Sequence, residues 1–256
     1  MTTTVGIVAP TRVPVDSTRK TSLVAGALYL ITFASSIPAV FLLSPVLSNP
    51  DYIVSAGADT SVLLGCFLDV VNALACIGTA VALYSVVKRQ HEGFALGFVT
   101  TRLLEAAIIV IGVVSLLSVV TLRQNLAGTA RADEASLVAV GQSLVAVRDW
   151  TFLLGPNLMA ALNALLLGTL MYRSGLVPRL IPTMGLIGGV LLLADVTAIF
   201  FGSYELGTVW HGIAAAPIFS WELSLGVWLV VKGFKPSPIT TNTVPAGAAH
   251  PSLPVA

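Results

Sequence analysis

Long apolar stretches alternate with short polar segments along most of the chain. A helix that crosses a lipid bilayer needs about 20 mostly apolar residues. The stretches that meet this length are residues 23–43, 62–87, 94–122, 150–172, 180–201 and 212–231. The pattern predicts an all-α integral membrane protein in which six transmembrane helices form one bundle over residues 23–231.

The composition supports a chain that is mostly surrounded by lipid. Hydrophobic residues make up 56% of the 256 residues and charged residues only 10%, whereas a water-soluble domain carries about 25% charged residues. We therefore expect the lipid bilayer to be the main partner of the chain. The net charge of +1 gives no electrostatic reason to expect nucleic acid as a partner.

Basic residues alternate between the two sides of the predicted bundle. Loops on the cytoplasmic side of a membrane retain Lys and Arg. The side that carries both termini has nine: Arg12, Arg19, Lys20, Lys88, Arg89, Arg173, Arg179, Lys232 and Lys235. The other side has three, spread along one long loop: Arg123, Arg131 and Arg148. The distribution predicts that the N- and C-termini are both cytoplasmic.

The segments outside the spans have their own patterns. Residues 1–22 and 232–256 are polar or rich in Pro, Thr and Ala, which predicts disordered cytoplasmic tails. In residues 131–149, apolar side chains recur at helical spacing opposite acidic and amide side chains. This predicts an amphipathic helix at the outer membrane interface, and the alternative is a lid over a cavity.

Charged and amide side chains interrupt the apolar spans. A charge near the bilayer centre costs about 2.5 kcal/mol or more, so such residues normally face the interior of a bundle. At 1.5 Å per residue, Glu105 and Glu222 lie about 16 Å and about 15 Å inside their spans, close to the midplane. We predict that these polar residues line one intramembrane cavity: Asp69, Arg102, Glu105, Asn157, Asp195 and Glu222.

The charges in this set do not balance. Arg102 precedes Glu105 by three residues and can pair with it on the helix surface. Four carboxylates nevertheless share one guanidinium. Either some carboxyl groups are protonated, or a cation, a cationic ligand or water lies among them. The alternative is that these charges only fix the packing of the helices.

Catalytic and metal-binding motifs are missing from the sequence. The histidines are His91, His211 and His250, which lie in a loop, at a span end and in a tail. They cannot form a zinc or bis-histidine haem site together. We find no HExxH, GxSxG or Walker motif. We therefore predict no catalytic residue, metal or cofactor.

Four stretches carry a resemblance to a known family. They are RDWTFLLGPNLMAALNALLLGTLMYRSGLVPRLIPTMGLIGG (148–189), WELSLGVWLVVKGF (221–234), RKTSLVAGALYLITF (19–33) and RLLEAAIIVIG (102–112). The chain resembles the domain-of-unknown-function family 4386, which consists of uncharacterised bacterial multi-pass membrane proteins. The resemblance covers residues 19–234 and implies a location in the bacterial cytoplasmic membrane. It implies no activity.

Two functions fit the sequence. In the first, a small solute, a lipid, a proton or a cation binds in the acidic cavity or is transported through it. Glu105 and Glu222 would accept the proton or cation, and Arg102 would adjust their affinity for it. In the second, the protein is a regulatory or scaffolding module that binds another membrane protein, and its buried charges only fix helix packing.

Overall fold

The computed structural model describes residues 15–55, 59–126 and 134–240, and all regular secondary structure in these ranges is helical. The elements in chain order are α1 (Val15–Ser48), α2 (Asp59–Val87), α3 (Glu92–Leu126), α4 (Glu134–Phe152), η1 (Leu153–Met159), α5 (Ala160–Ser174), α6 (Leu180–Phe200) and α7 (Val209–Val231). Within the described ranges, six helices are long and apolar enough to cross a membrane. The predicted fold class is confirmed.

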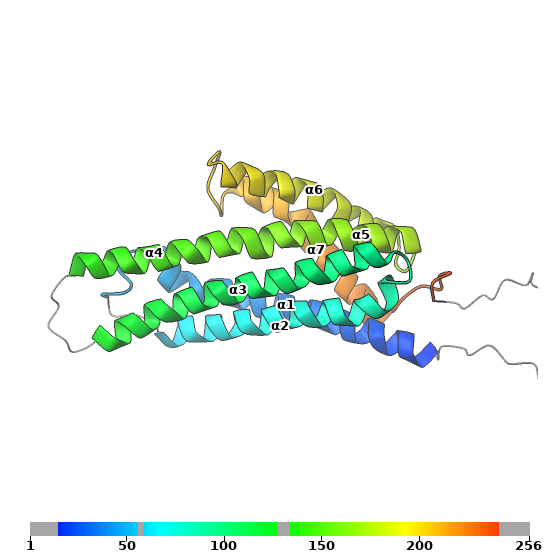
Figure 1. Cartoon of the computed structure of the whole chain (residues 1–256), viewed down its shortest axis with the longest axis horizontal. Coiled ribbons are helices and arrows are strands. Elements are labelled where there is room, and N and C mark those ends of the chain that lie inside the picture. Colours follow the sequence, from blue (N-terminus) through cyan, green and yellow to red (C-terminus); the bar gives the residue numbers. More distant parts are fainter. Residues whose placement is uncertain (1–14, 56–58, 127–133, 241–256) are drawn as a thin grey trace, which may run out of the picture.

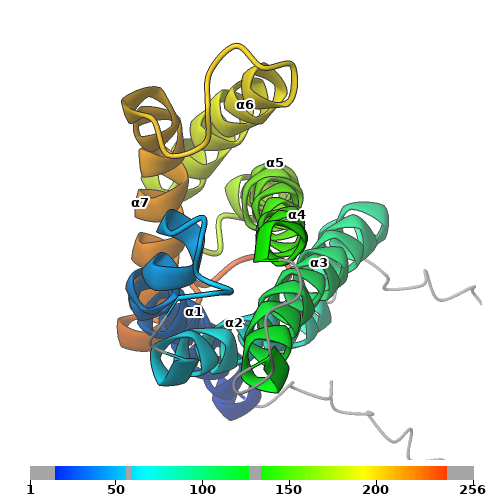
Figure 2. The same ribbon diagram turned by 90° about the vertical axis from the view of Figure 1, so that its left-hand side faces the viewer.

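The helices form a ring. Each contacts the next in chain order: α1 packs on α2, α2 on α3, α3 on the rod made of α4, η1 and α5, that rod on α6, and α6 on α7. Helix α7 packs on α1 and closes the ring. Figure 2 views this arrangement along the bundle and shows the helices placed around a common centre. Side chains from all of these elements can therefore meet in one interior.

The bundle has two different ends. We call the end that holds the start of α1 and the end of α7 the terminal end, and the opposite end the distal end (Figure 1). At the terminal end, the Arg19 side chain donates hydrogen bonds to the carbonyl oxygens of Leu229 and Val230, at 3.2 and 2.7 Å. These bonds fasten the start of α1 to the end of α7.

Parts of both predicted tails are ordered. Helix α1 begins at Val15, inside the segment 1–22 that the sequence predicted to be disordered. At the other terminus, the Lys235 N–H donates to the Leu176 carbonyl at 2.7 Å, and the Ser237 hydroxyl donates to the Ser174 carbonyl. These bonds hold residues 235–237 against the connection between α5 and α6. Residues 1–14 and 241–256 lie outside the described residues.

Helices α4, η1 and α5 form one continuous rod, Glu134–Ser174, of 41 residues. At 1.5 Å per residue it is about 60 Å long, about twice the thickness of the hydrocarbon core. The segment 131–149 was predicted to be an amphipathic helix at the outer membrane interface. Its described part, 134–149, is helical and continues along the axis of the spanning helix (Figure 1), because no turn separates the two. Residues 131–133 lie outside the described residues.

A π-helical turn carries this rod past Pro156. Proline has no N–H, so the Phe152 carbonyl four residues earlier loses its α-helical hydrogen bond. The side-chain amide of Asn157 donates to that carbonyl at 3.0 Å. The turn widens the helix locally, as π-turns do, and it lies at the wall of the interior space. Asn157 thus stabilises the π-helical turn, a role that its position in the span did not predict.

Candidate functional site: a polar cavity inside the helix ring

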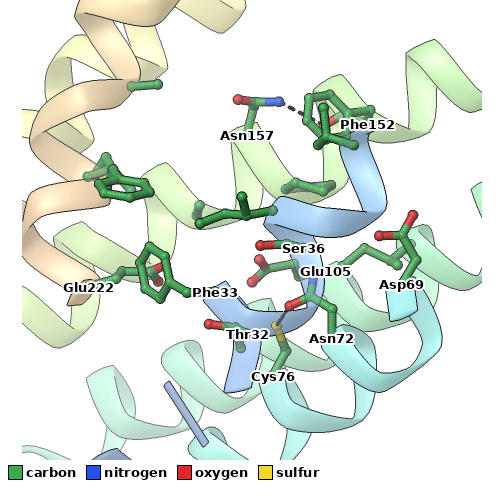
Figure 3. Close-up of a pocket in the computed structure, with 18 of the residues that line it drawn as sticks. Thr32, Phe33, Ser36, Asp69, Asn72, Cys76, Glu105, Phe152, Asn157 and Glu222 are labelled. Atoms are coloured by element: carbon green, nitrogen blue, oxygen red, sulfur yellow. Dashed lines mark hydrogen bonds between the residues drawn. The ribbon is translucent and has the colours of Figure 1, made fainter. Parts of the chain in front are cut away.

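A cavity of about 270 Å³ lies inside the ring, at the lower end of the size range of ligand sites. Figure 3 shows that Asp69, Glu105 and Glu222 approach this space from three different helices. The structure brings five of the six predicted residues to the cavity wall: Asp69, Arg102, Glu105, Asn157 and Glu222. Asp195 does not line it.

Arg102 is the centre of the cavity's charge network. Its side chain is 2% exposed, and one terminal nitrogen donates to Glu105 Oε2 at 3.1 Å. The other terminal nitrogen donates to the Tyr29 hydroxyl at 3.1 Å and forms an ion pair with Glu222. The guanidinium also lies over the Tyr29 ring, 5.2 Å from its centroid. One cation thus joins α1, α3 and α7.

The Glu105 carboxylate is held from one side only. Asn163 donates to Glu105 Oε2 at 2.7 Å, and the Thr101 hydroxyl in turn donates to Asn163 Oδ1. Arg102 donates to the same oxygen, Oε2. Among the described residues, none donates a hydrogen bond to the second oxygen, Oε1. That oxygen can therefore accept a hydrogen bond from a ligand.

Arg148 is a cavity residue that was not predicted from the sequence. Its guanidinium donates to Asp69 Oδ2 at 3.3 Å and lies over the Phe152 ring, 4.9 Å from the centroid. From the sequence, Arg148 was expected in a loop because it precedes the predicted span. One feature of the sequence could have indicated its place in the cavity. Arg148 lies two residues before the predicted span 150–172, and a long side chain at that position can reach inward.

Asp195 belongs to a separate cluster near the distal end. Its Oδ1 accepts a hydrogen bond from the Tyr204 hydroxyl at 2.7 Å, and its Oδ2 lies 2.7 Å from His211 Nδ1. The hydrogen bond to Asp195 raises the pKa of Tyr204, which lies in the connection between α6 and α7. The cluster links α6 to α7. His211 was expected only at a span end, and its pairing was not predicted.

These contacts correct the charge count made from the sequence. The cavity wall carries three carboxylates, Asp69, Glu105 and Glu222, and two guanidiniums, Arg102 and Arg148. If all are ionised, one negative charge is left over, which a proton or a cation would neutralise. In the described part of the chain, no group of three or more His, Cys, Asp or Glu side chains could hold a metal ion.

The ring of six apolar helices and its charged interior define the protein as an all-α multi-pass membrane protein. Residues 24–233 match the family described as "Domain of unknown function (DUF4386)", and the chain belongs to this family. The resemblance drawn from the sequence is confirmed. No curated protein matches the chain. No solved structure matches it either.

Proposed function

We propose that the protein binds or transports a small positively charged solute, a proton or a cation through its intramembrane cavity. The observation that most supports this proposal is the charge of the cavity wall. It carries three carboxylates but only two guanidiniums, so one negative charge is not balanced by a side chain of the wall. Glu105 offers a free oxygen to the cavity, while its other oxygen is fixed by Arg102 and Asn163. A preorganised anion with one open acceptor position favours a cationic occupant over an anionic one.

We also propose that the terminal end is cytoplasmic and that the membrane is the bacterial cytoplasmic membrane. Three aromatic rings near the terminal end each lie next to a cation: Tyr84 by Lys88, Tyr172 by Arg179 and Trp228 by Lys235. Aromatic residues of this kind mark a membrane interface, and cationic loops mark its cytoplasmic side.

The depth of the cavity fits this placement. Along the rod, Trp150 lies about 33 Å from Tyr172, and along α7, Trp210 lies about 27 Å from Trp228, if each residue rises 1.5 Å. These separations match the hydrocarbon thickness of about 30 Å. Glu222 then lies about 18 Å from Trp210 and about 9 Å from Trp228. It is well inside the hydrocarbon, where an unneutralised charge is unfavourable.

The orientation has a direct test. Ser203→Cys places a thiol in the connection between α6 and α7, on the distal side, and Glu92→Cys places one at the terminal end. Both positions are exposed. The native thiols Cys66 and Cys76 are buried. We expect a membrane-impermeant maleimide to label Ser203→Cys in intact cells and Glu92→Cys only after lysis. The reverse labelling would contradict the proposed orientation.

Glu105→Gln is expected to weaken ligand binding by at least about tenfold, about 1.4 kcal/mol. Glutamine keeps the size of the side chain and an oxygen for the donors at Oε2, but it removes the negative charge. The measurement is native mass spectrometry of the protein extracted in patches of its own membrane, wild type beside variant. A bound small molecule or lipid should be lost from Glu105→Gln, and its mass identifies it. For proton binding, the readout is proton uptake by the purified proteins.

The matched control is Glu92→Gln, the same chemical change at an exposed position on the same helix. It should bind like wild type. If Glu105→Gln retains every small molecule, takes up protons normally and also retains a partner protein, the binding function is contradicted. The charges would then act as packing groups of a regulatory or scaffolding protein.

A further inference from the structure

We infer that the cavity binds a primary ammonium group carried on an apolar chain, and that this ligand enters sideways from the distal half of the bilayer, between α1 and α7. The inference rests on the proposed function and deepens it by naming the ligand class and the route. It follows from the shape of the cavity wall, the packing of two helices and the chemistry of the unpaired acceptors.

The cavity is open at its side. Three of its lining residues, Ile37 and Val40 of α1 and Phe219 of α7, are also exposed on the outside of the bundle, at 43%, 53% and 46%. A side chain that both lines a cavity and faces outward lies at an opening. All three side chains are apolar, so the opening suits hydrocarbon better than water.

The packing of α1 and α7 explains the opening. In the terminal half the two helices are in close contact: a Cβ added at Gly26 would lie 2.7 Å from the Gly226 carbonyl oxygen. Phe33 and Phe219 then meet edge to face, with ring centroids 4.9 Å apart. Beyond this pair, α1 contains Pro38 and Pro45 and α7 contains Pro217, and prolines inside helices favour kinks.

The two helices pack on different neighbours in the distal half. Leu43 of α1 packs against Gly65 of α2, at 2.8 Å from a Cβ built there, whereas Pro217 of α7 packs against Gly188 of α6, at 2.9 Å. Figures 1 and 2 both show the distal ends of α1 and α7 apart. The contacts close the seam between α1 and α7 at the terminal side and leave it open at the distal side.

The cavity wall indicates what enters. The wall carries one more carboxylate than guanidinium, so a ligand with one positive charge would balance it. The Glu105 Oε1 and Asn157 Oδ1 oxygens accept no hydrogen bond from the described residues. A primary ammonium has three N–H donors for such acceptors, whereas a quaternary ammonium has none. Phe33, Phe152 and Phe219 also line the cavity, and aromatic rings attract cations.

The size of the cavity fixes how the ligand lies. A volume of about 270 Å³ holds a headgroup and a few carbon atoms, not a whole lipid. The rest of an apolar chain must leave through the opening, past Ile37, Val40 and Phe219, into hydrocarbon. A hydrated inorganic cation would have to shed its water against these apolar side chains at high cost. The ligand is therefore an alkylammonium, either a free amine or the headgroup of an aminophospholipid.

The test uses the full chain in nanodiscs of phosphatidylcholine, whose headgroup has no N–H. Octylammonium, ethylammonium, octyltrimethylammonium and octanol are titrated calorimetrically, with empty discs subtracted. We expect octylammonium to bind at least about tenfold more tightly than each of the other three, a difference of about 1.4 kcal/mol. Glu105→Gln should abolish the binding.

A pair of variants tests the route. Val40→Trp adds bulk at the opening, and Phe41→Trp makes a similar change at the next residue, which is 74% exposed and does not line the cavity. We expect Val40→Trp to slow octylammonium association at least about tenfold, with Phe41→Trp like wild type. If Val40→Trp behaves like Phe41→Trp, the sideways entry is wrong.

The outcomes separate this inference from the proposed function. If octylammonium binds no better than ethylammonium or octyltrimethylammonium, the named ligand class is wrong, while cation binding sensitive to Glu105→Gln would still stand. If no cation or proton distinguishes wild type from Glu105→Gln, the proposed function fails as well.

Exchanging the lipid identifies the source of the ammonium. In nanodiscs of phosphatidylethanolamine, a lipid ligand would occupy the cavity, raise the apparent Kd of octylammonium at least about tenfold and remain bound to wild type in native mass spectrometry. An unchanged titration would mean that the ligand is a free amine. Both results keep the primary ammonium as the recognised group.

Discussion

Arg102→Met is expected to destabilise the bundle by about 3–5 kcal/mol, which is the usual cost of removing one partner from a buried ion pair. Methionine fills most of the same volume, so the loss is mainly electrostatic. Glu105 and Glu222 would lose their shared cation in a region where neither is well hydrated. The measurement is unfolding of the purified protein in mixed micelles, followed by circular dichroism.

A triple variant separates charge from packing. Arg102→Met combined with Glu105→Gln and Glu222→Gln removes all three charges and leaves side chains of similar size. Because a buried ion pair replaced as a whole is often neutral or stabilising, the triple variant should recover most of the lost stability. If it is as unstable as Arg102→Met alone, the network is held by shape and hydrogen bonding, and its charge contributes little.

Gly26→Ala is expected to destabilise the bundle by about 1–3 kcal/mol, the usual cost of overpacking. The added Cβ would lie 2.7 Å from the Gly226 carbonyl oxygen and 2.8 Å from the Val230 amide nitrogen. Both are backbone atoms, so no side-chain rotation relieves the clash, and α1 must move away from α7. The same unfolding experiment measures the effect. A loss of ligand binding would show that the movement of α1 has also changed the cavity wall.

The matched control for this variant is Gly212→Ala. Gly212 lies in α7, and a Cβ built there meets no atom within 4 Å. Because alanine favours a helix over glycine by about 1 kcal/mol, this change should be neutral or slightly stabilising. Equal behaviour of the two alanine variants would show that α1 and α7 are not in close contact in the membrane.

The sequence predicted part of the candidate site for a clear reason. Arg102 and Glu105 are three residues apart, and helix geometry alone places such residues on one face. The structure contains this ion pair. The cost of a charge in hydrocarbon likewise predicted that Asp69, Glu105 and Glu222 would point inward. Each of these inferences needs only one helix and its surroundings.

The partners of these residues on other helices were not predictable in this way. Glu222 reaches Arg102 across 120 residues of chain, and Arg148 reaches Asp69 across 79. Helical periodicity shows which face of a helix is buried, but not which helix faces it or how far one has slid along the other. Asp195 was therefore grouped with the cavity, although Tyr204 and His211 hold it elsewhere.

The sequence alone determined the kind of protein this is: the bilayer requires about 20 apolar residues for each crossing, and six stretches of the chain meet that length. The tertiary structure alone decided the order of helices around the ring and the opening between α1 and α7. It also decided that the ion pairs of Arg102 with Glu105 and Glu222 and of Arg148 with Asp69 lie in one cavity. These features depend on close contacts such as that of Gly26 with Gly226. The hydrophobicity of the sequence does not predict such contacts, because a leucine side chain gains no hydrophobic free energy when it moves from lipid to the protein interior.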